Sequence, residues 1–147
     1  MKTVILAIFL VSTAIVGSAG PAAAEDTPQL VKLPAPAQEA LREEMLGNLV
    51  ALNEVLSLMD EGRVKDAGAV AEAKLGMSAM GKHRAKPFDA RPGPHMPPAM
   101  LSIGMDGHKA FSEFARVAAT GDRDQALALL PNLTAACVAC HYSYRTR

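Results

Sequence analysis

Residues 37–60 read AQEALREEMLGNLVALNEVLSLMD, and this stretch sets the pattern for much of the chain. Its apolar side chains recur at steps of three and four residues, which at about 100° per residue places them on one face of a helix. Acidic residues such as Glu43 and Glu54 lie mostly off that face. We therefore predict an amphipathic helix over residues 37–60, ended by Gly62. Its expected buried face consists of Leu41, Met45, Asn48, Leu49, Leu52, Val55, Leu56 and Met59.

Three further segments have helical spacing, at residues 64–80, 98–120 and 122–144. The first carries a stripe of small residues, which lets helices approach closely. The last contains Pro131, which lacks a backbone donor and should kink the helix locally. No segment alternates between polar and apolar residues as a strand does. With short connections inside each helix pair, the pattern predicts an all-α fold, an antiparallel four-helix bundle.

The composition excludes several classes of protein. The 147 residues include 15 Lys or Arg and 15 Asp or Glu, so the formal net charge is zero. A neutral chain lacks the positive field of a general nucleic-acid binder. Its two cysteines cannot staple a disulfide scaffold, and two thiolates alone do not complete a structural zinc site. The length fits one domain, which we place at residues 37–147.

Residues 1–24 have the pattern of a secretory signal peptide. Lys2 precedes an apolar run over residues 4–16, and small residues end at Ala24. Cleavage there would leave 14 basic and 15 acidic side chains. We therefore expect an exported, periplasmic protein with no membrane span after cleavage. Residues 25–36 contain three prolines and little pattern, so we expect a flexible lead-in.

The strongest functional signal is Cys137-Val138-Ala139-Cys140-His141, near the end of the last predicted helix. C-x-x-C-H is the attachment pattern for c-type haem. Two thiols three residues apart can each form a thioether with one haem vinyl group, and the adjacent imidazole can ligate the iron. On a helix all three side chains share one face. The alternatives are a thiol–disulfide protein that uses the C-x-x-C pair without haem, and a partial metal site.

The longer pattern CxxCHxxYR, at the end of the last of four helices, resembles the cytochrome c-prime family of class II c-type cytochromes. This resemblance implies one haem c per chain, held by thioethers at Cys137 and Cys140, with His141 as the proximal iron ligand. It also implies that Tyr144 and Arg145 lie near the haem. Members are electron carriers or haem-binding proteins rather than enzymes, and they often form homodimers.

The sixth iron ligand separates two functions. A methionine sulfur there favours one-electron transfer, whereas an apolar residue leaves iron open to gases such as NO or CO. In the family this residue comes from the first turns of the first helix. The helix face favours Met45 as the ligand, while the family's spacing from Arg42 points to Leu46. Other methionines and His83, His95 and His108 compete weakly for the same position.

A long basic loop is expected between the second and third helices, because residues 81–98 hold five prolines. Its cations are Lys82, Arg84, Lys86 and Arg91. It is either a solvated connection or a surface, at residues 82–91, that docks acidic redox partners in the periplasm.

Overall fold

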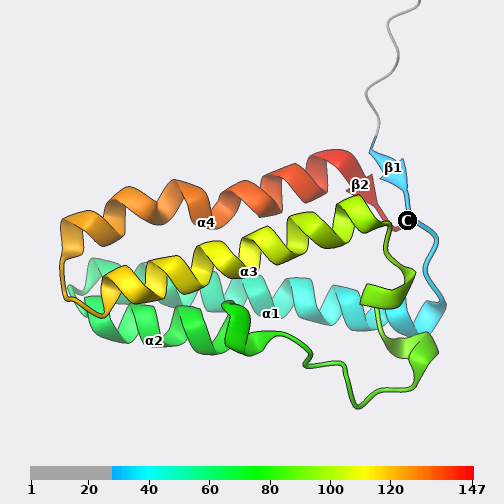
Figure 1. The fold of residues 1–147 in the computed structure, drawn as a ribbon, viewed down its shortest axis with the longest axis horizontal. Helices are drawn as coiled ribbons and strands as arrows, with labels where there is room; N and C mark the ends of the chain where they lie inside the picture. Colours follow the sequence, from blue (N-terminus) through cyan, green and yellow to red (C-terminus); the bar gives the residue numbers. More distant parts are fainter. Residues whose placement is uncertain (1–27) are drawn as a thin grey trace, which may run out of the picture.

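The computed structural model describes residues 28–147, and within them the protein is mainly helical (Figure 1). The predicted signal peptide lies outside the described residues. Four α-helices carry the structure, and short 3-10 turns and a two-stranded pair complete it. The helices are α1 (Ala35–Asp60), α2 (Val64–Lys74), α3 (Pro98–Ala118) and α4 (Arg123–Ser143). The shorter elements are β1 (Gln29–Leu30), η1 (Met77–Ala79), η2 (Phe88–Ala90), η3 (Gly93–His95) and β2 (Tyr144–Arg145).

The tight turns between helices are made by glycines, as predicted for Gly62. Gly62 and Gly121 have φ values of 74° and 84°, a left-handed conformation that glycine adopts without steric cost. After Gly121, the side chain of Asp122 accepts a hydrogen bond from the backbone N–H of Gln125 and caps α4. The helix then runs unbroken through Pro131.

The second helix is shorter than predicted, because α2 ends at Lys74 rather than at residue 80. The Glu72 carboxylate accepts hydrogen bonds from the backbone N–H and hydroxyl of Ser78 and from the hydroxyl of Ser112. His108 Nδ1 lies 2.7 Å from the carbonyl oxygen of Leu75, one of the acceptors left over at the helix end. These contacts to η1 and α3 fix the chain where it leaves α2, and the sequence of α2 alone does not reveal them.

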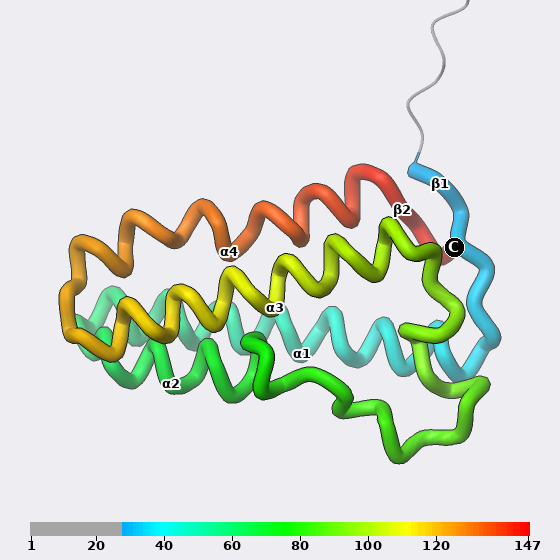
Figure 2. Tube along the Cα trace, viewed as in Figure 1, coloured from blue at the N-terminus to red at the C-terminus, as the bar shows by residue number. Residues whose placement is uncertain are grey.

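Consecutive helices pack side by side in the order α1, α2, α3, α4, as the trace in Figure 2 shows. The long connection between α2 and α3 runs along the outside. A Cβ at Gly68 would stand only 2.8 Å from the Cβ of Ala118, so this glycine permits the close approach of α2 to α3. The main core consists of Ala51, Val55, Leu58, Met59, Val64, Ala67, Ala71, Leu75, Phe111, Phe114, Val117, Ala118, Ala126 and Leu133.

The buried face of α1 is rotated from the predicted one. Leu41, Val55 and Met59 are buried as expected, but Met45, Leu49 and Leu56 are exposed. Alanines take their place, because small side chains let α1 lie close to its neighbours. The residues of α1 that are buried are Ala37, Ala40, Leu41, Ala51, Val55, Leu58 and Met59.

The prediction that no strand exists is wrong for the two ends of the described chain. β1 pairs in parallel with β2, with Gln29 opposite Tyr144 and Leu30 opposite Arg145. Two-residue strands carry too little periodicity to be recognised in a sequence. The expected lead-in therefore contains regular structure within its described part, and Val31, which follows β1, is buried.

Candidate functional site

The apolar interior consists of two separate clusters. Besides the main core, a second group surrounds the end of α4, and we call it the motif-end cluster. It contains the buried residues Val31, Leu41 and Met100, with the partly buried Leu33, Met96, Cys140 and Tyr144 packed against them. Thus α1, α3 and α4 each contribute residues to both clusters, and the two clusters lie near opposite ends of these helices.

Between the two clusters, side chains that continue the buried faces of α3 and α4 are partly exposed to solvent. On α3, Ile103, Gly107 and Ala110 are only half-buried, although Met100 and Phe111 on the same stripe are buried. On α4, Cys137 is exposed, although it lies on the stripe between buried Leu133 and half-buried Cys140.

On α1, the positions that continue the buried face between Leu41 and Ala51 are Glu44 and Asn48, which are both half-buried. Met45 lies beside that face and is 38% exposed. Because Leu41 and Ala51 belong to different clusters, Met45 is at the level of the interruption seen on α3 and α4. Residues of α1, α3 and α4 between the two clusters are therefore partly open to solvent.

The two cysteines differ in their surroundings. Both are free thiols, with Cys137 exposed and Cys140 half-buried. Burial raises the pKa of the Cys140 thiol, and the neighbouring Cys137 raises it further. A redox-active C-x-x-C pair depends on a lowered thiol pKa at a helix N-terminus. The position of the pair at the end of α4, rather than at a helix N-terminus, counts against the thiol–disulfide alternative.

The remaining motif residues occupy the last turn of α4 and the strand after it. His141 is exposed, one turn after Cys137. Tyr144 is half-buried in the motif-end cluster, whereas Arg145 is exposed. Their predicted position near a haem stays a prediction.

Between the two residues considered as sixth ligand, the helix geometry favours Met45. It lies one turn beyond Leu41, which packs in the same cluster as Cys140. Leu46 is 64% exposed and points about 100° further round the helix. Met96 and Met100, two of the competing methionines, lie in the motif-end cluster with Cys140, a placement that the sequence spacing does not reveal.

The histidines outside the motif have other partners. His83 Nε2 lies 3.0 Å from Glu44 Oε2, and His95 Nε2 lies 3.2 Å from the carbonyl oxygen of Phe88. His108 is held by the end of α2. Across residues 28–147, no group of three or more His, Cys, Asp or Glu side chains could hold a metal ion.

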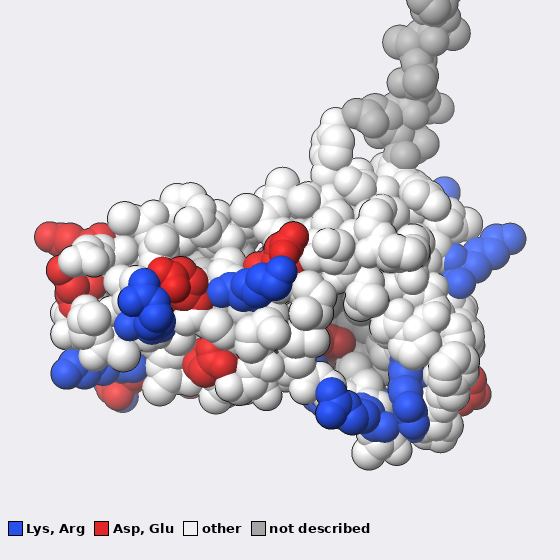
Figure 3. Space-filling view, viewed as in Figure 1, with Lys and Arg blue, Asp and Glu red and all other residues white. Residues whose placement is uncertain are grey.

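The basic loop lies against α1, with η2 packed on that helix. Lys82 Nζ is 3.2 Å from Glu44, and Lys86 Nζ is 3.8 Å from Glu43. The acidic residues of α1 thus offset part of the positive charge of the loop. Figure 3 nevertheless shows Lys and Arg side chains gathered beside a hollow on this part of the surface.

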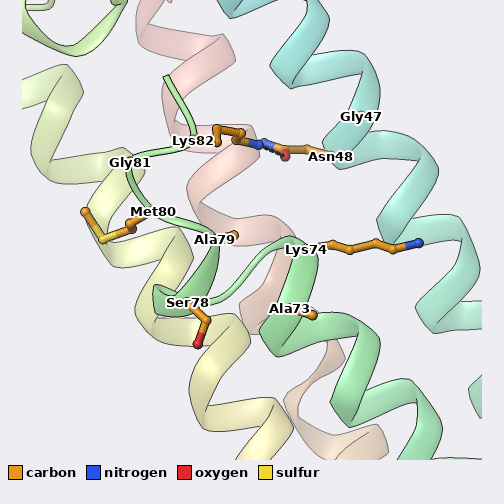
Figure 4. Close-up of a pocket in the computed structure, with 9 residues that line it drawn as sticks. All are labelled: Gly47, Asn48, Ala73, Lys74, Ser78, Ala79, Met80, Gly81 and Lys82. Carbon is orange, nitrogen blue, oxygen red and sulfur yellow. Dashed lines mark hydrogen bonds between the residues drawn. The ribbon is translucent and has the colours of Figure 1, made fainter. Parts of the chain in front are cut away.

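A hollow of about 480 Å³ lies between α1, the end of α2 and the start of the loop (Figure 4). Lys82 points towards Asn48 across it, with the amine 3.4 Å from the amide oxygen. Lys74 at its edge pairs with Glu54. None of the motif residues lines this hollow. The residues that do are Gly47, Asn48, Ala73, Lys74, Ser78, Ala79, Met80, Gly81 and Lys82.

Within the described residues, α4 is long and apolar enough to cross a membrane by length and composition. Only 11% of the apolar window of α4 is buried. The expected absence of a membrane span after cleavage stays a prediction.

Comparisons with family models, with curated proteins and with solved structures find no match to this chain. The functional assignment therefore depends on the motif and on its surroundings.

Proposed function

We propose that this protein is an exported monohaem c-type cytochrome that transfers single electrons. Its four helices would form an antiparallel bundle with one haem c attached to α4. The observation that carries this proposal is the position of C-x-x-C-H. The motif borders the interrupted stretch between the two apolar clusters, with Cys140 half-buried at the edge of one of them.

The residues around the motif fit such a group. Cys137 and Cys140 would hold it covalently, and His141, one turn from Cys137, would donate an imidazole nitrogen from the same helix face. Ile103 and Gly107 supply an apolar wall on α3. The bound haem supplies an iron that accepts and releases one electron. The side chains around the group would set the polarity of its surroundings, which is one of the means by which a protein tunes such a potential.

A sixth ligand from Met45 supports electron transfer over gas binding. Its thioether lies on the turn after Leu41, at the level of the interruption. If Met45 does not reach the iron, the apolar residues of α1 and α3 leave an open position suited to NO or CO. A gas-binding haem protein is therefore the second candidate.

Visible spectra of the ferric and ferrous protein, with and without CO, separate these candidates. Electron transfer with Met45 ligation predicts a low-spin ferric spectrum and a ferrous spectrum that CO does not readily change. Ready CO binding would favour the gas-binding function. A purified protein without a haem spectrum would overturn both.

The remaining parts of the proposal concern location and partners. Export to the periplasm depends on cleavage of residues 1–24. With haem against α4, the apolar residues of that helix would be covered without a membrane, which supports the exported form. Acidic redox partners would dock on the loop at residues 82–91, where cations gather. A homodimer also stays a prediction.

A further inference from the structure

The two ends of the described chain are tied together directly beside the motif. β1 pairs with β2, and the backbone N–H of Val31 extends this pairing by donating to the carbonyl oxygen of Arg145 at 2.8 Å. From α1, Gln38 Nε2 donates to the carbonyl oxygen of Thr146 at 2.6 Å. We call the residues that make these contacts the terminal clasp. They are Gln29, Leu30, Val31, Gln38, Tyr144, Arg145 and Thr146.

The terminal clasp also packs against the motif. Val31 is 5% exposed and shares the motif-end cluster with Cys140 and Tyr144. Tyr144 belongs both to β2 and to the end of α4, where its backbone N–H donates to the carbonyl oxygen of Cys140. The strand pairing therefore begins where the helix that carries the cysteines ends.

A helix end without such partners frays, because its last carbonyl oxygens have no hydrogen-bond donors within the helix and few other contacts hold the turn. Here the last turn of α4 leads directly into the strand pair, and its Cys140 packs against the cluster of Val31, Leu41 and Met100. Cys140 faces this packing, whereas Cys137, one turn earlier, is exposed.

We propose that the terminal clasp positions the last turn of α4 and shields the Cys140 thiol, while Cys137 stays open. Val31 and Gln38 are thus positioning residues for the C-x-x-C-H turn. The shielding of Cys140 is a property of the chain itself, and only its consequence for haem rests on the proposed function.

Thiol alkylation of the full chain made without haem tests the shielding. The variants Cys137→Ala and Cys140→Ala each retain a single thiol. The rate at which iodoacetamide labels that thiol is measured in the folded chain and in the same chain unfolded in urea. With each thiol compared with its own rate in urea, we expect Cys140 to be slowed about tenfold more than Cys137, a factor that corresponds to about 1.4 kcal/mol.

Val31→Ala should remove most of this protection at Cys140 and leave the Cys137 rate unchanged. Val50→Ala is the matched control, because it makes the same change at a valine that is 60% exposed on α1. Equal protection of the two thiols in the parent chain would overturn the proposal. So would a Val31→Ala variant in which both thiols gain reactivity equally.

The haem-loaded protein supplies an independent readout of positioning. Val31→Ala and Gln38→Glu should shift the reduction potential in the same direction, and Val50→Ala should not shift it. An unchanged potential in both clasp variants would contradict a positioning role. If the parent protein carries no haem, the proposed function fails, while the thiol reactivities still decide whether the clasp shields Cys140.

Discussion

Met45 lies one helical turn beyond buried Leu41 and is itself 38% exposed. Its neighbour Leu46 points about 100° further round α1 and is 64% exposed. Met45 therefore lies on the side of α1 that carries Leu41, whereas Leu46 points away from that side. The identity of this one side chain therefore decides which function the proposed haem site performs.

Replacing Met45 with alanine should convert the ferric spectrum from low spin to high spin, because the sixth ligand is lost. Leu46→Ala is the control and should leave the spin state unchanged. The measurement is the visible spectrum of the ferric protein for each variant. A spectrum that stays low spin in Met45→Ala removes this residue as ligand, and a change in Leu46→Ala alone would support the spacing from Arg42.

Glu72 is a single residue whose carboxylate has a structural role at the end of α2. Hydrogen bonds from the hydroxyls of Ser112 and Ser78 lower the pKa of its carboxyl below the ordinary value of about 4.5, although desolvation opposes them. A lowered pKa in the folded state means that the ionised carboxylate stabilises the fold. This contribution is complete above the unfolded value and is lost as the pH falls through the folded pKa.

Glu72→Gln should therefore lower the free energy of unfolding by about 1 kcal/mol at pH 7, since the charge-assisted hydrogen bonds are lost. The difference in unfolding free energy between the variant and the parent protein should shrink as the pH falls from about 5 towards about 3, through the range in which carboxyl groups titrate. Urea unfolding at each pH measures it, with Glu39→Gln as a surface control. A difference that stays constant over this range would contradict the account.

At the scale of elements, the contact between α2 and α3 depends on a missing side chain. A Cβ at Gly68 would lie 2.8 Å from the Cβ of Ala118 and 3.1 Å from the carbonyl oxygen of Ala115. Neither atom is the end of a flexible side chain. The helices must therefore separate to admit even a methyl group at this position.

Gly68→Ala should lower the free energy of unfolding by about 1–3 kcal/mol, because overpacking outweighs the gain in helix propensity. Gly47→Ala in α1 is the matched control, because nothing lies within 4 Å of its added Cβ. The Gly47→Ala substitution should instead raise the free energy of unfolding by about 0.5–1 kcal/mol. Urea unfolding of both variants gives the signs, and a stabilising Gly68→Ala would mean that α2 and α3 are further apart than described.

The sequence predicts the helices well and their ends unevenly. Gly62 and Asp122 act locally, so the turns that they make can be recognised from neighbouring residues. The end of α2 depends on Ser112 and His108, which lie on another helix. Contacts between segments far apart in the chain leave no periodicity, and β1 with β2 is the same case.

At the scale of the whole molecule, the motif could be read directly, while its surroundings could not. The spacing of Cys137, Cys140 and His141 is local. The separation of the interior into two clusters arises only when α1, α3 and α4 pack together. The rotation of the buried face of α1 towards its alanines has the same origin, because a helix with apolar residues on several sides does not specify which side faces its neighbours.

The central claim, that one haem is bound covalently through Cys137 and Cys140, is tested most directly by acid–acetone extraction of the purified, exported protein. The account predicts that the haem colour stays with the chain, and that a chain with both Cys137→Ala and Cys140→Ala loses it. Complete loss of the colour from the parent protein would contradict covalent attachment.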